Sequence, residues 1–126
     1  MARVIIGEDC GNSPKNILLK NLTVAIVNGD VEFILASVTD DICWNIVGSM
    51  LIRGKDDFAE VLEQMKSDKA TTLTIKHIAT HGKAGAVDGT IKMKNGKTRA
   101  FCDVYEFGNA KGTRVKEITS YMIVLK

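Results

Sequence analysis

The second half of the chain is a succession of four β-rich segments. From Thr71 onward they read TTLTIKHIAT, AVDGTIKMK, TRAFCDVYEF and RVKEITSYMIVL, and the turns between them contain HGK, NGK and GNAKG. Asn95 and Gly96 give the strongest hairpin signal, because both residues tolerate the positive φ angles that a tight turn demands. Four consecutive strands joined by short turns predict an antiparallel meander.

The first half of the chain carries helical patterns. Ser13 and Pro14 suit the N-cap and the first position of a helix that we expect to run to about Val27, with Gly29 as its end. Asp30 is then suited to cap a second, short helix, VEFILASV. The third helix is the clearest, because apolar side chains recur at i, i+3, i+4 and i+7: Phe58, Val61, Leu62 and Met65.

Between the helices, ICWNIV is rich in β-branched and aromatic residues and predicts one more strand. We place Asp40 and Asp41, which precede it, in a loop. Helices followed by a run of strands predict an α+β fold, in which the helices pack on one face of a bent antiparallel sheet. Residues 1–12 are expected to form an arm or an edge strand, and residues 13–126 to form a single domain.

The charge balance excludes a large class of functions. Lys and Arg number 17 and Asp and Glu 15, which gives a net charge of +2. This charge is too small for a dedicated nucleic-acid binder or for a protein held on an anionic membrane. A cluster of basic residues does lie on the predicted hairpin, where a solvated edge that deters strand pairing explains it: Lys92, Lys94, Lys97 and Arg99.

Cysteine usage indicates a reducing compartment. The three cysteines, Cys10, Cys43 and Cys102, are odd in number and match no zinc or redox spacing, so free thiols are expected. No apolar run approaches the ~18–20 residues that a membrane-spanning helix requires. The first residues also lack the longer apolar stretch of a secretion signal. We therefore expect a cytoplasmic protein with no membrane partner.

The order of these elements is similar to that of a known superfamily. The first helix ends in NGD, and FILASVTDDICWNIVG, LIRGKDDFAEVL and the closing VKEITSYM follow it. From Ser13 to Met122 this order resembles the nuclear transport factor two-like (NTF2-like) superfamily, closest to its SnoaL-like and ketosteroid-isomerase-like branch. The resemblance implies a conical barrel, in which a strongly bent antiparallel sheet wraps N-terminal helices around a central pocket, often in a dimer.

The resemblance carries the functional residues of the isomerase across only in part. Its general base falls at Ile46 and its oxyanion-hole tyrosine falls at Leu22, so neither group is present. Its protonated oxyanion-hole aspartate falls at Asp103, which matches. A single carboxyl cannot readily remove a proton and stabilise the enolate in one step. The usual steroid-isomerase activity is therefore not expected.

Asp103 is also the sharpest candidate from the residues themselves. If its strand alternates strictly, Phe101, Tyr105 and Phe107 share its face. Burial among aromatic rings would raise the pKa of the carboxyl and suit it to acid–base chemistry. Two other interpretations stay open: Arg99 on the same face pairs with Asp103, or this face is the solvated one.

Further candidates lie around Asp103. His77 is considered as a proton shuttle to Asp103, and Asp88 as a third member of the network, unless the following Gly89 marks a bulge that disturbs the alternation. His77 and His81 do not fit one zinc ion, because four residues along a strand separate them by roughly 13 Å, and no metal site is predicted. The predicted ligand-binding wall is mostly apolar with few polar groups: Leu22, Trp44, Ile46, Tyr105, Ile118, Ser120 and Met122.

These observations predict a small-molecule-binding cone protein that performs proton transfer of the isomerase, dehydratase or cyclase type on a small apolar organic substrate. GKAGAVDG lacks the spacing and the setting of a nucleotide loop, so no cofactor is expected. The alternative is a non-catalytic ligand-binding or protein-interaction module of the same fold. We also expect a homodimer through the outer face of the sheet, to which alternation assigns several mostly apolar residues: Val87, Ile91, Met93, Val115, Thr119 and Tyr121.

Overall fold

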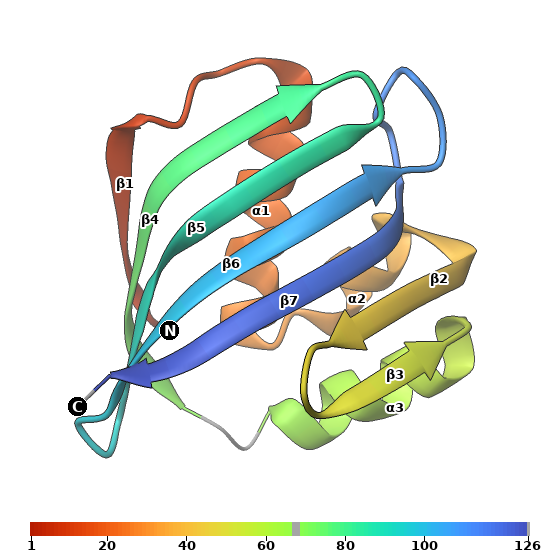
Figure 1. Ribbon diagram of the computed structural model, residues 1–126. Helices are drawn as coiled ribbons and strands as arrows, with labels where there is room; N and C mark the ends of the chain where they lie inside the picture. The colour runs from red at the N-terminus through yellow and green to blue at the C-terminus, as the bar shows by residue number, and fades with distance from the viewer. Residues whose placement is uncertain (67–68, 126) are drawn as a thin grey trace.

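Three helices and one seven-stranded sheet make up the computed structural model, which describes residues 1–66 and 69–125 (Figure 1). In chain order the elements are β1 (Arg3–Asp9), α1 (Pro14–Asn28), α2 (Val31–Ala36), β2 (Val38–Ile46), β3 (Met50–Arg53), α3 (Lys55–Met65), β4 (Ala70–His81), β5 (Ala84–Met93), β6 (Thr98–Phe107) and β7 (Val115–Leu125). The strand order in the sheet is β1-β4-β5-β6-β7-β2-β3.

Strands β4 to β7 form the predicted antiparallel meander, in which each strand pairs with the next. Two strands from the first half of the chain extend it. β1 pairs with β4 and β2 pairs with β7, both in parallel. The sequence allowed either an arm or an edge strand for residues 1–12, and residues 3–9 form an edge strand. The four-residue β3, which pairs with β2, was missed because so short a segment shows no alternation.

The sheet curls strongly around the helices but does not close, so β1 and β3 are its two edges (Figure 1). α1 packs on β4 and β5, and α3 packs on β2 and β3. Leu19 and Leu22 from α1 and Phe58 and Leu62 from α3 are fully or almost fully buried. The predicted α+β cone is confirmed. Among the described residues, no helix has the length and apolar character needed to cross a membrane.

Local capping explains where the first two helices begin. The Ser13 Oγ accepts a hydrogen bond from the backbone N–H of Asn16 at 3.2 Å. The carboxylate of Asp30 accepts one from the backbone N–H of Phe33 at 3.3 Å. Gly29 ends α1 in the left-handed conformation, with φ of 73°, which glycine adopts without steric cost. The predicted ends of α1 and the predicted start of α2 are confirmed.

The prediction of a loop at Asp40 and Asp41 was wrong. Both residues lie in β2 with exposed side chains. Asp41 accepts a hydrogen bond from the Thr39 hydroxyl at 2.6 Å. Acidic residues interrupt an apolar run in the sequence, but the pairing of β2 with β7 shifts register between Val38 and Cys43, so both aspartates are exposed although they are consecutive in the strand.

A β-bulge in β4 decides which face of the sheet its side chains take. Ile75 is opposite Gly89 and His77 is opposite Asp88, so Lys76 is an extra residue without a counterpart in β5. Strict alternation along the strand is lost at this point. Residues that follow the bulge take the face opposite to the one that counting from Ile75 predicts.

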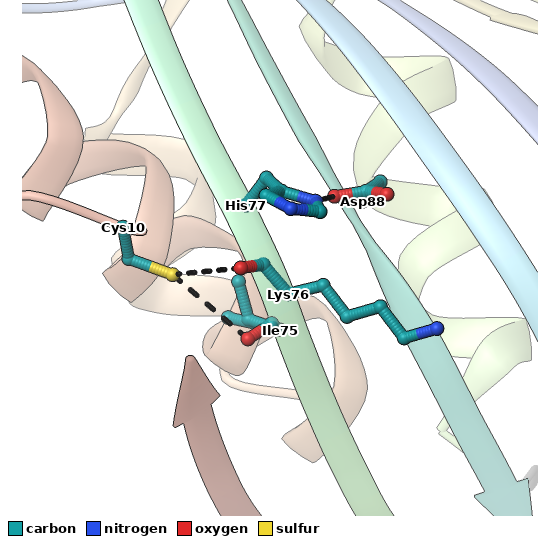
Figure 2. Close-up of polar contacts among 5 residues, drawn as sticks. All are labelled: Cys10, Ile75, Lys76, His77 and Asp88. Carbon is teal, nitrogen blue, oxygen red and sulfur yellow. Dashed lines mark hydrogen bonds and ion pairs between the residues drawn. The ribbon is translucent and has the colours of Figure 1, made fainter. Parts of the chain in front are cut away.

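Residues on both neighbouring sides of β4 contact the bulge: Gly89 from β5 and Cys10 from the segment after β1. A Cβ atom on Gly89 would overlap the carbonyl oxygen of Thr74, so the closest approach of β5 to β4 requires glycine. From the side of β1, the buried Cys10 thiol shares its single proton between the carbonyls of Ile75 and Lys76, with sulfur–oxygen distances of 3.8 and 3.7 Å (Figure 2). The thiol therefore has a structural role here.

Candidate functional site

An apolar cavity of about 220 Å³ lies between the concave face of the sheet and the helices α1 and α3. Its lining is mostly aliphatic and aromatic: Thr23, Ile26, Val27, Trp44, Ile46, Met65, Ala70, Ile91, Met93, Arg99, Phe101, Asp103, Ser120 and Met122. A cavity with many apolar side chains and few convergent polar groups is typical of a site for a small organic molecule.

Asp103 places a carboxyl group in this apolar wall. It lies in β6 directly opposite Ser120 of β7, whose hydroxyl hydrogen-bonds to the carboxylate. Burial disfavours the charged form and raises the pKa of Asp103 from 3.8 to about 6, although the Ser120 hydrogen bond acts in the opposite direction. The carboxyl therefore titrates close to neutral pH, where it is able to exchange protons with a ligand.

Trp44 holds Ser120 in the orientation that this hydrogen bond requires. The indole N–H of Trp44 donates to the Ser120 Oγ at 2.9 Å. Because an indole can only donate, the hydroxyl proton of Ser120 stays available for Asp103. The Trp44 ring in turn packs edge-on against Phe58, with ring centroids 5.5 Å apart. Phe58, Trp44 and Ser120 thus form a series of contacts that ends at the carboxyl of Asp103.

Thr23 and Tyr105 form a second polar pair beside the cavity. The Thr23 hydroxyl donates to the carbonyl of Leu19 at 2.8 Å, so the 3.3 Å contact between Thr23 and Tyr105 has the Tyr105 hydroxyl as its donor. Tyr105 is completely enclosed, and its burial, with a smaller effect of the Asp103 charge, raises its pKa well above the ordinary value of 10. Tyr105 therefore stays neutral with its proton engaged, and it is unsuited to act as a base.

Arg99 shares the cavity wall with Asp103 but does not pair with it. None of the ion pairs among the described residues includes Arg99. Its Nη1 points instead at the sulfur of Met122, at 3.9 Å, and its Nε is buried without a hydrogen-bond partner. The sequence left open that Arg99 neutralises Asp103, but the two side chains form no ion pair. It also left open that this face of the strand is solvated, but both side chains line the cavity.

The predicted ligand-binding residues divide into two groups. Four line the cavity: Trp44, Ile46, Ser120 and Met122. The other three are at most 1% exposed and lie in the core outside its lining: Leu22, Tyr105 and Ile118. One position along a helix turns the side chain by about 100°, so Thr23 reaches the cavity in place of Leu22. Sequence reasoning missed Thr23, although its spacing of three residues from Ile26 was a usable signal.

His77 lies on the outer face of the sheet, on the opposite side from Asp103. Its Nδ1 is 2.9 Å from the carboxylate of Asp88, as the sequence allowed, but this pair faces outward (Figure 2). Across the sheet, Asp88 is opposite Cys102, whereas Asp103 is opposite Val87. His77 is therefore not placed to shuttle protons to Asp103, because the bulge reverses its expected side.

The outer face differs from the predicted one in four residues. Val87 and Val115 are fully buried, and Ile91 and Met93 line the cavity. Alternation identified residues 87, 91 and 93 of β5 as one set. Val87 is opposite Asp103 and Ile91 is opposite Arg99, which assigns that set of residues to the inside of the sheet.

Solved structures of similar fold come from several organisms. An NTF2-like protein of unknown function from Cytophaga hutchinsonii is 25% identical, with a TM-score of 0.68, and the match covers 85% of this chain and 97% of that one. An LEH-like epoxide hydrolase of M. tuberculosis is 22% identical, with a TM-score of 0.71 and coverage of 85% and 80%. A protein described as a SnoaL-like polyketide cyclase from Shewanella denitrificans is 13% identical, with a TM-score of 0.74 and coverage of 88% and 92%. No curated protein matches the chain.

The family comparison agrees with the fold. The SnoaL-like domain family matches residues 20–117, which include most of α1 and continue into β7. This range holds both Trp44 and Asp103. Together with the curled sheet and its fold neighbours, the match shows that this chain belongs to the SnoaL-like domain family of the NTF2-like superfamily.

Proposed function

We propose that this protein is an enzyme that transfers protons on a small apolar organic substrate without a cofactor, with Asp103 as general acid or base. The observation that carries the proposal is a carboxyl with a pKa of about 6 in the wall of an apolar cavity. At pH 7 about nine in ten such groups are ionised, because the pKa lies about one unit lower. The same residue is therefore able to accept a proton from the substrate and to return it.

Isomerisation, dehydration and ring closure are the reaction types that fit this site. Each needs a proton to be taken from one atom and delivered to another, and none changes the oxidation state of the substrate overall. The names of two similar structures, an epoxide hydrolase and a polyketide cyclase, support chemistry of this class. The apolar lining favours a substrate with little charge beside Asp103, and Ser120 stabilises the carboxylate after it gives up its proton.

Hydrogen exchange at carbon tests the proposal. Cyclic ketones and β-keto esters are incubated with the protein in D₂O, and the loss of their α-hydrogens is followed by NMR. We expect exchange whose rate rises with pH, with an inflection near pH 6 and a plateau above about pH 7, because the ionised Asp103 is the base. Asp103→Asn should abolish it. Ser120→Ala removes the hydrogen bond that favours the carboxylate and should move the inflection to higher pH.

His77→Gln is the matched control for this assay. Imidazoles commonly titrate in the same pH range, but His77 lies on the outer face. The variant should keep both the rate and the inflection of the wild type. Exchange that persists in Asp103→Asn contradicts the role assigned to Asp103.

A ligand-binding module without turnover is the second candidate. The observation that favours it is that Leu22 and Ile46 stand where the isomerase has its tyrosine and its base, and both are apolar. In this case the same ketones would change the fluorescence of Trp44, which lines the cavity, but no exchange would be seen at any pH. The two measurements together separate binding from catalysis.

We also propose that two copies associate through the outer face of the sheet. Exposed apolar side chains gather there: Val104, Tyr121, Ile123 and Leu125. Beside them is a shallow depression with small side chains in its lining: Ala79, Ala86 and Ala100. Contiguous apolar surface of this kind is uncommon on monomers, and a two-fold pairing of identical faces would remove it from water.

A further inference from the structure

Arg99 is the charged group of the cavity wall that the proposed chemistry does not use. Its Nε is buried without a hydrogen-bond partner, and its Nη1 contacts the sulfur of Met122 at 3.9 Å. A thioether is a weak acceptor, and a buried donor that lacks a partner is destabilising. Among the described residues, no carboxylate forms an ion pair with Arg99. The guanidinium thus has hydrogen-bonding capacity that a ligand could satisfy.

The guanidinium leans along the cavity toward Asp103. In the register of β6 and β7, Arg99 is opposite Val124, whereas Met122 is opposite Phe101, two residues nearer to Asp103. The contact with Met122 therefore tilts the head of Arg99 away from its own cross-strand neighbour. Four residues of strand separate the Cα atoms of Arg99 and Asp103 by roughly 13 Å. Phe101 lines the wall between the two.

Three lysines lie in the chain close to the Arg99 end of the cavity. Met93 and Ala70 line the cavity at this end. Lys94 follows Met93 in the chain, and Lys69 precedes Ala70. The backbone N–H of Lys94 donates to the carbonyl of Lys69 at 2.9 Å, which brings these two lysines to the same end. Lys97 follows in the same hairpin, and its carbonyl accepts from the N–H of Met93. Exposed lysines whose backbone lies at this end of the cavity favour the approach of an anion.

We propose that the ligand of this cavity is an amphiphilic organic anion, whose carboxylate pairs with Arg99 and whose apolar body extends past Phe101 to Asp103. This inference rests on the proposed function and adds the class of substrate. A guanidinium offers two parallel N–H donors that match a carboxylate, and a neutral ligand of the same shape would leave the buried Nε unpaired. The pairing also orients the substrate, because it brings the end remote from the carboxylate to Asp103.

A matched pair of ligands isolates the contribution of the charge. Octanoate and octan-1-ol share a chain and differ in their head group, and hexanoate and hexan-1-ol repeat the comparison at a shorter length. Binding is followed at pH 7.5 by calorimetry and by the fluorescence of Trp44, the sole tryptophan, which lines the cavity. We expect the wild type to bind the carboxylate at least tenfold more tightly than the alcohol.

Two substitutions at Arg99 and one control test the assignment. Arg99→Met keeps an apolar stem and should reduce the preference to less than twofold, by weakening carboxylate binding while alcohol binding is unchanged. Arg99→Lys keeps the charge without the planar donor pair and should retain part of the preference. Arg114→Met removes an exposed arginine outside the cavity lining and should keep the full preference.

The possible outcomes separate this inference from the proposed function. Equal affinity of the wild type for acid and alcohol overturns the carboxylate assignment but leaves the enzyme proposal standing, because the cavity still binds an apolar ligand. A preference that Arg99→Met leaves unchanged also overturns the assignment. If neither ligand of either length binds, the assignment fails together with the proposed binding of organic ligands.

Discussion

At the scale of single residues, the ionisation of Asp103 couples the stability of the protein to its chemistry. Burial raises the pKa of the folded-state carboxyl from 3.8 to about 6. Between these two values the folded protein holds the proton more tightly than the unfolded chain does. The free energy of unfolding contributed by this group therefore falls as the pH rises through this window, and stays low above it. A reactive carboxyl near neutral pH is kept at the expense of stability.

Asp103→Asn should reverse this loss. The substitution keeps the shape and removes the charge, so we expect the free energy of unfolding at pH 8 to exceed that of the wild type by about 2–3 kcal/mol, the equivalent of roughly two pKa units. As the pH falls below 3.8 the carboxyl becomes protonated in both states, and the difference should shrink toward zero. Urea denaturation at pH 8 and pH 3.5 measures both values.

Asp88→Asn, on the outer face, serves as the control and should show no such gain. A loss of stability at pH 8 in Asp103→Asn would instead indicate a structural carboxylate.

At the scale of the element, the bulge in β4 separates a core-facing stretch from an outward-facing histidine. Leu73 and Ile75 are fully buried before the bulge, and Ile78 is buried after it, so His77 takes the outer face. The bulge requires that β5 approach β4 closely at Gly89. Glycine at position 89 therefore allows the close approach beside the bulge, and the bulge places His77 on the outer face.

Gly89→Ala should destabilise the protein. The added Cβ would overlap the carbonyl oxygen of Thr74, which belongs to the backbone and cannot rotate away. We expect a loss of about 1–3 kcal/mol in the free energy of unfolding, which is typical of overpacking. Gly108→Ala is the control: its Cβ would meet a side-chain methyl of Thr39 at 3.0 Å, which is able to move, so the loss should stay below about 1 kcal/mol. Chemical denaturation compares the two, and an unaltered midpoint for Gly89→Ala would contradict this account.

The sequence could predict elements but not the faces they present. Helix periodicity, caps and the Asn95-Gly96 turn are local, so α1, α3 and the meander could be predicted. The side taken by His77 depends on an extra residue in the pairing of β4 with β5, and a glycine such as Gly89 signals a bulge without showing which strand carries the extra residue. The aromatic neighbours of Asp103 suggested an enclosed carboxyl. The unpaired state of Arg99 and the access of Thr23 to the cavity depend on how distant elements pack, and alternation within one element carries no such information.

At the scale of the whole molecule, the exposed apolar outer face predicts a dimer. Ile123 is 67% exposed and belongs to this apolar face, so Ile123→Lys should place two like charges in a two-fold interface. We expect light scattering with chromatography to give about twice the 13.7 kDa chain mass for the wild type and a value near 13.7 kDa for the variant. Ile17→Lys, at an exposed apolar position on α1, should remain dimeric. A wild type that is monomeric at micromolar concentration rules this interface out.

The parallel pairing of β2 with β7 also sets the order in which the site can be assembled during synthesis. β2 leaves the ribosome before any strand of the meander, yet its partner is the last strand to be made. The hydrogen bond from Trp44 to Ser120 joins residues 76 positions apart, and contacts of such long range form later than local hairpins. A nascent chain is thus able to form its helices and its first hairpins while the carboxyl of Asp103 still faces water. The acid–base centre comes into existence only when the final strand docks.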